Sequence, residues 1–290
     1  MSRPALKSKL PTVFIDGEAG TTGLGIRQRL AGRRDLEVIS IDPAKRKDAA
    51  ARGEMMKRAD VTILCLPDDA AKEAVALDAT LGAEGTRFVD ASTAHRVAPG
   101  WVYGFPELSR EQRAAIAGAR HVANPGCYPT GAIALLRPLV DAGLMAADHP
   151  VTVNAVSGYT GGGKSMIEAY DKGEAPAFEL YGLGLEHKHV PELQRYSNLT
   201  RRPIFVPSVG NFRQGMLVSV PLHLETLRPG ASIAAIRAAL ADRYAGSPWV
   251  SVIPADRTAA MGGRIEPEAL NDTNGLELLV FANEARGQLV

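Results

Sequence analysis

The sequence is poor in cysteine, and its charges nearly cancel. Two cysteines, Cys65 and Cys127, occur in 290 residues, which argues against a disulfide framework. So low a count favours a reducing cytoplasm, where a thiol can be kept for chemistry. A formal net charge of +1 provides no overall field that would attract nucleic acid or a membrane surface. We therefore expect neither as a partner.

Long apolar runs are also missing. No stretch approaches the roughly 18 apolar residues of a membrane-spanning helix. Arg3, Lys7 and Lys9 have no apolar segment behind them, so we expect no secretory signal peptide. The cysteine and histidine spacings match no zinc site, and we expect no metal. Hydrophobic residues make up 46% of the chain and charged residues 22%, the balance of a globular protein with a sizeable core.

The first part of the sequence alternates short apolar runs with helix-like segments. Strands are predicted at 12–16, 37–41, 61–66 and 87–90, and helices at 22–32, 47–58, 69–81 and 109–119. Alternation of this kind predicts a parallel sheet covered by helices, and nearly unbroken apolar runs fit strands buried on both faces. The sequence thus predicts an α/β protein whose residues 1–126 form a Rossmann-like dinucleotide-binding domain.

The pattern changes after residue 150. Longer strands are predicted at 151–157, 204–207 and 216–223, and helices at 130–140, kinked by Pro138, and at 232–245, capped by Ser232. The run 216–223 does not look buried on both faces, which favours an antiparallel or mixed sheet. We expect residues 127–290 to form an α+β catalytic and dimerisation domain with a mixed sheet.

Three glycines, Gly17, Gly20 and Gly23, follow the first predicted strand at intervals of three. Glycine allows a tight turn and lets a pyrophosphate approach the backbone closely. The helix opened by Thr21 or Thr22 would present its N–H groups to that pyrophosphate. An ordinary glycine-rich turn is the alternative, but the place after the first strand of an α/β run favours a dinucleotide site.

The end of the second predicted strand should meet the adenosine ribose. Asp42 stands about 20 residues after the last glycine, as an acceptor for the ribose 2′-hydroxyl would. Lys45, Arg46 and Lys47 follow, with Arg52 further along, and cations there suit the 2′-phosphate of NADP. A solvated basic helix start is the alternative, and we expect NADP(H).

Cys127 lies in Asn-Pro-Gly-Cys-Tyr-Pro-Thr, residues 124–130, directly before a predicted helix. Backbone N–H groups and the helix dipole stabilise a thiolate at such a position, which makes a nucleophile available at neutral pH. A lone cysteine is more often a small buried apolar residue, and Cys65 fits that description. Gly126 and Pro129 flank Cys127 with a sharp helix entry and argue against burial there.

Six motifs in a fixed order carry a family likeness. They are Gly17-x-x-Gly20-x-x-Gly23, Asp-Ala-Ser-Thr-Ala-His-Arg at 90–96, Gly-Phe-Pro-Glu-Leu at 104–108, the Cys127 segment at 124–130, Ser-Gly-Tyr-Thr-Gly-Gly-Gly-Lys at 157–164, and His-Lys-His-Val-Pro-Glu-Leu at 187–193. Together they resemble the N-acetyl-γ-glutamyl-phosphate reductase family in its shorter bacterial form, over about residues 12–285.

The resemblance implies a reaction, a cofactor and an assembly. NADPH would reduce the acyl phosphate N-acetyl-L-glutamyl 5-phosphate to N-acetyl-L-glutamate 5-semialdehyde and inorganic phosphate, a step of arginine biosynthesis in the cytoplasm. Cys127 would form a thioester with the acyl group before hydride transfer. The family likeness also implies a two-domain fold and a homodimer or homotetramer.

An acid/base partner for Cys127 is needed, and a histidine near neutrality can serve as both acid and base. His189 is the candidate, with His187 as an anchoring residue on the substrate side. Glu192 could hydrogen-bond a histidine or simply begin the helix at Pro191. The remaining histidines lie in no chemical constellation and are expected to be structural: His95, His121, His149 and His223.

Substrate and cofactor contacts follow the same motifs. Arg96 comes after the strand ending at Asp90, where α/β proteins bind ligands, and an arginine can grip a carboxylate or phosphate bidentately; a surface arginine is the alternative. Ser157 and Gly158 open a turn that could cradle substrate oxygens. The resemblance adds Ser92 to the cofactor site and Arg213 to anion binding, the latter shifted by one position from the family's Pro-Arg-Gly.

The chain departs from the resemblance at its end. Family members continue past the position of Val290 with an Asp-Asn-Leu-Gly-Lys-Gly-Ala-Ser-Gly type segment that returns to the cofactor domain, and we expect that return to be missing here. Two other functions stay open. One is a semialdehyde dehydrogenase of the same architecture, such as the aspartate-semialdehyde type. The other is a truncated NADP-binding protein without turnover.

Overall fold

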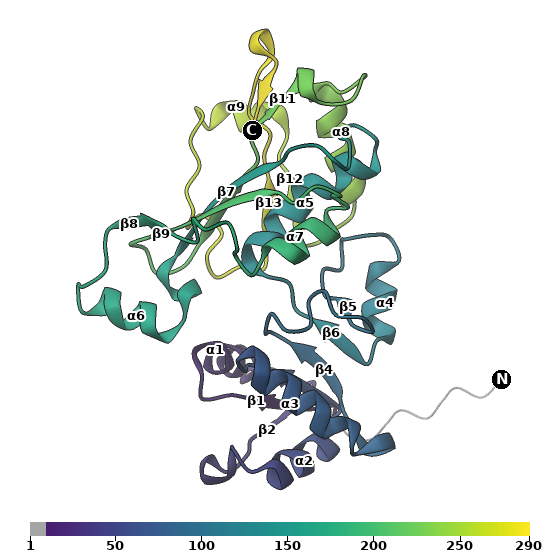
Figure 1. Ribbon diagram of the computed structural model, residues 1–290, viewed down its shortest axis with the longest axis vertical. Helices are drawn as coiled ribbons and strands as arrows, with labels where there is room; N and C mark the ends of the chain where they lie inside the picture. The colour runs from purple at the N-terminus through teal and green to yellow at the C-terminus, as the bar shows by residue number, and fades with distance from the viewer. Residues whose placement is uncertain (1–9) are drawn as a thin grey trace, which may run out of the picture. The chain divides into compact units, whose positions relative to one another are not determined.

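The computed structural model describes residues 10–290, which form two compact units (Figure 1). The first unit contains residues 10–104 and 114–125, and the second contains 105–113 and 126–290. Residues 105–113, which we expected in the first domain, therefore group with the second unit. The basic segment from Arg3 to Lys9 lies outside the described residues.

The first unit is built on a six-stranded parallel sheet with the strand order β2-β1-β3-β4-β6-β5, and every neighbouring pair is parallel. Helices accompany the strands in the alternation that the sequence predicts (Figure 1). The elements are β1 (Thr12–Asp16), α1 (Thr21–Leu30), β2 (Glu37–Ile39), η1 (Pro43–Lys45), α2 (Ala49–Arg58), β3 (Val61–Leu64), α3 (Asp68–Ala79), η2 (Gly82–Glu84), β4 (Arg87–Asp90), β5 (Val102–Tyr103), α4 (Gln112–Gly118, whose first two residues belong to the second unit) and β6 (His121–Ala123).

Burial explains why these segments form a sheet. All five residues of β1 are buried, and Phe14 packs in a core with Met56, Leu64 and Phe88. The strands predicted at 37–41 and 61–66 end two residues early, at Ile39 and Leu64. The residues just past β1, β2 and β3 are thereby released to line a cavity at the carboxyl edge of the sheet, where α/β proteins bind ligands.

The second unit contains a four-stranded mixed sheet with the order β10-β7-β9-β8, in which β7 and β9 are parallel and the outer pairs are antiparallel. This confirms the predicted mixed sheet. The elements are α5 (Cys127–Asp141), β7 (Thr152–Gly158), η3 (Tyr159–Gly162), α6 (Lys164–Asp171), β8 (Phe178–Leu180), α7 (Val190–Tyr196), β9 (Ile204–Gly210), β10 (Met216–Ser219), β11 (Leu222–His223), η4 (Leu224–Thr226), α8 (Ile233–Tyr244), β12 (Val250–Val252), α9 (Ala255–Ala260), β13 (Leu276–Leu278), β14 (Ala282–Asn283), η5 (Glu284–Arg286) and β15 (Gln288–Leu289).

Helix α5 contacts α7, α8 and β10. It begins at Cys127, three residues before the predicted start at Thr130, because Pro129 sits in the first turn, where no backbone donor is needed. Pro138 lies inside the helix and cannot donate to the carbonyl of Ala134. The hydroxyl of Tyr244 on α8 donates to that carbonyl instead, at 2.8 Å.

The strand predicted at 216–223 is divided between two sheets. β10 belongs to the mixed sheet, whereas β11 pairs with β15 in a separate three-stranded sheet. Pro221 stands between them and lacks the donor that a continuing ladder needs. Within residues 10–290, no helix is long and apolar enough to cross a membrane.

Candidate functional site

The β1–α1 turn and the first turn of α1 each contain a glycine at which there is no space for a side chain. A Cβ at Gly17, whose φ is +92°, would lie 2.4 Å from the carbonyl oxygen of Cys65. A Cβ at Gly23 would lie 2.4 Å from the carbonyl oxygen of Gly17. Gly20 is the N-cap of α1, and Thr21 and Thr22 are its exposed first residues. The turn is therefore closed against β3 and opens only outward, as a pyrophosphate cradle should.

A cavity of about 320 Å³ lies beside this turn. Of the predicted cofactor residues, Gly17, Gly20 and Arg46 line it, and Lys47 lines it as well. Lys45 is exposed beside the cavity without lining it. The carboxylate of Asp42 accepts from the backbone N–H of Ala44 at 2.9 Å and so caps η1. The cavity thus combines a glycine turn, a helix N-terminus and cations, which fits a dinucleotide phosphate group.

Arg52 does not join the cations of this cavity. Its Nε and Nη2 donate to Oδ2 of Asp16 at 3.1 and 2.7 Å. Burial raises the pKa of Asp16, and the Arg52 guanidinium acts in the opposite direction. The pair joins the end of β1 to α2, so its contribution is to the shape of the cavity wall.

Ser92 and Arg96 lie on a loop after β4 that is organised by a buried carboxylate. Asp90 has no exposed surface and accepts from the backbone N–H and hydroxyl of Ser92, at 2.9 and 2.7 Å, and lies 2.5 Å from Nδ1 of His95. Arg96 is 8% exposed and donates from Nε to the carbonyl of Asn124 at 3.1 Å and from Nη2 to that of Ala91 at 3.3 Å. His95 is therefore structural, and Arg96 is fixed in place at the carboxyl ends of β4 and β6.

Cys127 is the first residue of α5, and its side chain is exposed. Gly126 is the helix N-cap in an extended conformation, and its N–H donates to Oε2 of Glu192 at 2.9 Å. The predicted nucleophile therefore stands at a helix N-terminus whose preceding residue is anchored by a carboxylate from α7.

A second cavity of about 320 Å³ adjoins Cys127. None of the residues that line this cavity has a charged side chain. The lining consists of Cys127, Ser157, Gly158, Thr160, Gly161, Gln214, Gly215, Met216, Pro267, Leu270, Asn271, Gly275 and Leu276. A Cβ at Gly158 would lie 2.7 Å from the backbone of Arg213 and Gln214, so this close approach requires glycine. The N–H of Gly158 donates to the carbonyl of Gly215, which leaves the hydroxyl of Ser157 as a polar group presented by this turn.

Arg213 is exposed and absent from this lining, although its carbonyl accepts from the N–H and the hydroxyl of Thr160 at 3.1 and 2.6 Å. Gln214 and Asn271, which the sequence does not single out, also border the cavity with their amides. Gln214 directly follows Arg213, which the family likeness assigns to anion binding. Asn271 comes from a loop far along the chain, and no local pattern indicates it.

His187 and His189 meet the edge of the Tyr128 ring, with centroid distances of 6.5 and 5.9 Å. His189 is 6% exposed and precedes α7, whereas His187 is half-buried and also contacts the ring of Tyr181 at 5.7 Å. Nδ1 of His187 accepts from the backbone N–H of His189 at 3.2 Å. The structure therefore brings both histidines to the residue that follows Cys127.

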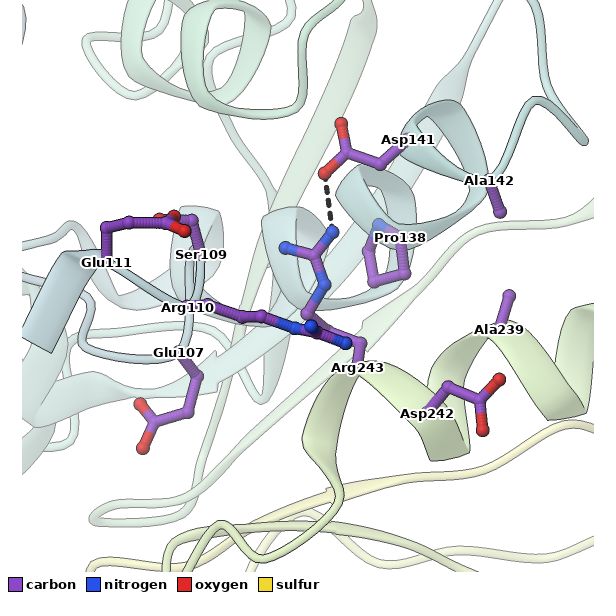
Figure 2. A pocket seen from close by; sticks show the side chains of 10 residues that line it. All are labelled: Glu107, Ser109, Arg110, Glu111, Pro138, Asp141, Ala142, Ala239, Asp242 and Arg243. Carbon is purple, nitrogen blue, oxygen red and sulfur yellow. Dashed lines mark hydrogen bonds and ion pairs between the residues drawn. The ribbon is translucent and has the colours of Figure 1, made fainter.

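A larger cavity, of about 420 Å³, shares no lining residue with the one beside Cys127 (Figure 2). Asp141 at its edge accepts from Arg243 on α8 at 2.5 Å and from Arg137 at 2.8 Å. Arg243 also donates to the carbonyl of Leu108 at 2.5 Å. These contacts hold α5, α8 and residues 105–113 together. Among residues 10–290, no three His, Cys, Asp or Glu side chains are grouped so that they could hold a metal ion.

Comparison with known proteins matches most of the chain to the two domains of one protein family. A family model described as the NAD binding domain of semialdehyde dehydrogenase matches residues 18–116, and one described as its dimerisation domain matches residues 127–290. Two curated relatives, from Brucella ovis and Brucella canis, are called N-acetyl-gamma-glutamyl-phosphate reductase. Each is 56% identical to this chain over 284 residues, which cover 96% of this chain and 91% of the relative.

Solved structures show the same fold at low sequence identity. Aspartate semialdehyde dehydrogenase from Francisella tularensis superimposes with a TM-score of 0.70 at 13% identity, covering 97% of this chain and 93% of that one. The Candida albicans enzyme, solved with NADP, gives a TM-score of 0.61 at 13% identity and covers 97% and 92% of the two chains. At such identities the likeness establishes the architecture alone.

Proposed function

Because this chain belongs to the semialdehyde dehydrogenase family, we propose that it reduces N-acetyl-L-glutamyl 5-phosphate to N-acetyl-L-glutamate 5-semialdehyde and phosphate, with NADPH as the reductant. The observation that carries the proposal is the exposed thiol of Cys127 at the first residue of α5, beside a cavity without charged side chains. The names of the relatives that are 56% identical supply the substrate. Arginine biosynthesis and a reducing cytoplasm follow from that substrate and from the need for a reduced thiol.

The chain's own residues account for the covalent step. The Cys127 thiolate attacks the acyl carbon, the carbon–oxygen bond to phosphate breaks, and the enzyme retains a thioester. The N–H groups at the start of α5 stabilise the thiolate before attack. The cofactor that Gly17, Gly20, Arg46 and Lys47 would hold, NADPH, would supply the hydride that reduces this thioester. The resulting thiohemiacetal then releases the aldehyde and regenerates Cys127.

A histidine serves as the acid/base partner of the tetrahedral intermediates and donates to the oxygen that becomes negatively charged in them. The sequence favours His189, but two observations favour His187. His189 is 6% exposed, whereas the ring of His187 is more accessible. In neutral His187, the N–H of His189 occupies Nδ1 and fixes the proton on Nε2, so the residue has a defined donor. Separate His187→Asn and His189→Asn variants decide between them, because loss of the acid/base residue removes the corresponding limb of the pH–rate profile.

The remaining predicted site residues divide between anion binding and support. Arg96 is the proposed anion-binding arginine for the substrate, held rigid by the carbonyls of Asn124 and Ala91. Arg213 is exposed and lies outside the lining of the Cys127 cavity, so it would act only on a part of the substrate that projects from it. Glu192 and Ser92 are proposed to support the site indirectly. Glu192 accepts from the N–H of Gly126, and Ser92 donates to the carboxylate of Asp90.

NADP(H) is proposed to bind at the β1–α1 turn. Gly17, Gly20 and Gly23 admit the pyrophosphate, and Arg46 and Lys47 in the cavity wall meet the 2′-phosphate. Oδ1 of Asp42 accepts from the N–H of Ala44 in capping η1, and its second carboxylate oxygen is proposed to meet the ribose. The double variant Arg46→Ala/Lys47→Ala should raise KM for NADPH by about tenfold or more and leave KM for NADH nearly unchanged.

The chain is also proposed to form a homodimer or a homotetramer through its second unit, which matches a dimerisation domain. Apolar side chains with large exposed fractions lie on β8 and in the segment that follows it: Phe178 57%, Leu180 50%, Leu183 59% and Leu185 44%. An apolar surface of this kind is typical of a protein interface. Leu180→Asp should lower the mass measured by light scattering, whereas Leu24→Asp, exposed on α1, should not.

The decisive assay runs the reaction backwards, with N-acetylglutamate semialdehyde and NADP⁺ in the presence and absence of phosphate. Turnover that requires phosphate and disappears in Cys127→Ser supports the proposal. Preference for aspartate semialdehyde would instead favour the aspartate-semialdehyde type. A thermal shift by NADP⁺ without any turnover would favour a cofactor-binding protein that lacks activity.

A further inference from the structure

Three hydroxyl groups, from α5, β7 and the segment that follows β8, form a chain beside Cys127. Tyr128 on α5 lies 2.9 Å from Oγ of Ser157 on β7 and 2.9 Å from the carbonyl oxygen of Ser208 on β9. The hydroxyl of Tyr181 donates to that of Tyr128 at 3.3 Å. The chain therefore starts at Tyr181 and passes through Tyr128 to Ser157, which borders the same cavity as Cys127.

The hydroxyl protons of Tyr128 and Ser157 can be arranged in two ways along this row of hydrogen-bonded hydroxyl groups. Tyr128 has one hydroxyl proton and two acceptors within reach, the carbonyl of Ser208 and Oγ of Ser157. When Tyr128 donates to Ser208, the Ser157 hydroxyl donates either to Tyr128 or to the carbonyl of Gly158, 3.3 Å away. When Tyr128 turns its proton to Ser157, the Ser157 proton is released toward the cavity.

Resting on the proposed function, we propose that Ser157 donates a hydrogen bond to the oxyanion that forms when Cys127 attacks a carbonyl carbon, and that Tyr128 and Tyr181 position and polarise this donor. Attack of the thiolate forms the sulfur–carbon bond and moves the carbonyl π electrons onto oxygen. Ser157 turns its O–H toward that oxygen, and Tyr128 turns its O–H from Ser208 to Ser157. Every proton stays on its own oxygen, so no further reactant is needed.

The neutrality of the cavity makes such a donor important. No charged side chain lines the space beside Cys127, so a negative charge that develops there must be met by dipoles and hydrogen bonds. The amides of Gln214 and Asn271 border the same space, but neither is connected to Tyr128. Ser157 differs from them because a buried phenol, 2% exposed, stands directly behind it.

The two tyrosines remain donors at every pH at which the enzyme would work. Burial raises the pKa of Tyr128, and hydrogen bonds from Ser157 and Tyr181 only partly offset this. Burial is also the main reason that the pKa of Tyr181 lies well above its usual value, and its hydrogen bond to Tyr128 adds to the shift. Donation along the chain therefore persists through neutral and moderately alkaline pH.

The test is a double-mutant cycle on the Cys127-dependent reverse reaction. Ser157→Ala should lower kcat/KM by about 100-fold, which is the size of effect expected for one oxyanion donor, with KM changed less than about threefold. Tyr128→Phe should lower it by about tenfold, and Tyr181→Phe by less. The double variant Ser157→Ala/Tyr128→Phe should be no slower than Ser157→Ala alone, because Tyr128 acts through Ser157.

Matched controls separate this role from a loss of packing. Tyr244→Phe removes a buried hydroxyl that donates to Ala134, and Ser219→Ala removes a hydroxyl that donates to Asn154. Both should stay within about twofold of the wild-type rate. Multiplicative losses in the double variant, or a Ser157→Ala enzyme with nearly full kcat, would overturn the inference while the Cys127 chemistry stands. A wild-type protein without phosphate-dependent turnover, or an active Cys127→Ser variant, would instead overturn the proposed function and this inference with it.

Discussion

The carboxylate of Glu192 accepts a hydrogen bond of 2.9 Å from the backbone N–H of Gly126, the residue before Cys127. Glu192 is 1% exposed and lies in the first turn of α7, so it reaches α5 across a separation of 66 residues in the sequence. The contact fixes the entry into α5 and therefore the direction in which its first N–H groups point. The sequence left open whether Glu192 meets a histidine or begins a helix. It lies in the first turn of α7 and anchors the segment of the nucleophile.

Replacing this carboxylate should separate its acceptor role from its charge. Glu192→Ala leaves the buried N–H of Gly126 without this acceptor, which costs about 1–3 kcal/mol of stability, and we expect kcat to fall at least tenfold. Glu192→Gln keeps an oxygen at the same place and should recover most of the stability measured by urea unfolding. Glu168→Ala, on exposed α6, is the control. Equal damage from Gln and Ala would show that the charge matters more than the acceptor.

The glycine turn offers a test with a control in the same helix. Gly23→Ala places a Cβ 2.4 Å from the Gly17 carbonyl and 2.6 Å from Cα of Glu18, both of them backbone atoms that cannot simply move away. We expect NADPH binding measured by calorimetry to weaken by at least tenfold, with a loss of thermal stability. Gly25→Ala, in the same helix, meets nothing within 4 Å. It should bind NADPH normally and gain about 0.5–1 kcal/mol of stability.

The sequence predicts well where local pattern decides the structure. Buried strands such as Thr12–Asp16 have unbroken apolar runs, and Ser232 caps its helix through a contact three residues away. Strand β5, only two residues at the sheet edge, is too short to show periodicity. Residues 105–113 join the second unit through contacts such as Arg243 to Leu108, which lie 135 residues apart and leave no local signal.

The candidate site shows the same division. Cys127, Ser157 and the glycine turn stand out because each depends on a short motif beside a helix or strand end. Arg52 stands apart from the cations of the β1–α1 cavity because Asp16 engages its guanidinium, a contact between distant residues that no local pattern indicates. The hydroxyl chain ending at Ser157 comes from separate elements, and only the folded chain brings its members together.

The two cysteines should differ sharply toward alkylating reagents. Burial, together with the charges of Asp16 and Asp90, raises the pKa of Cys65 to about 11, so its thiol is almost entirely protonated at neutral pH. Cys127 is exposed at the start of α5. Limited iodoacetamide at pH 7.5, followed by peptide mass spectrometry, should label Cys127 at least tenfold faster than Cys65. Equal labelling would contradict the assignment of Cys127 as the reactive thiol.

Acid should weaken the contact between α5 and α8 through Asp141 (Figure 2). Burial alone would raise the pKa of Asp141, but hydrogen bonds from Arg243 and Arg137 outweigh it and lower the pKa below its usual 3.8. A carboxylate whose pKa is lower in the folded than in the unfolded chain stabilises the fold at pH values above its pKa in the unfolded chain. That contribution is lost as the pH falls through the folded pKa.

Asp141→Asn removes this dependence and keeps nearly the same size of side chain. At pH 7 the variant should melt about 2–4 °C below the wild type, the shift that ~1 kcal/mol produces in a domain of this size. From pH 6 to pH 3 the wild-type midpoint should fall more steeply, so that the two curves converge in acid. Asp242→Asn, exposed on α8 at the same cavity, should run parallel to the wild type throughout. A constant gap between the wild type and Asp141→Asn across this range would show that the arginines are held by packing rather than by the charge of Asp141.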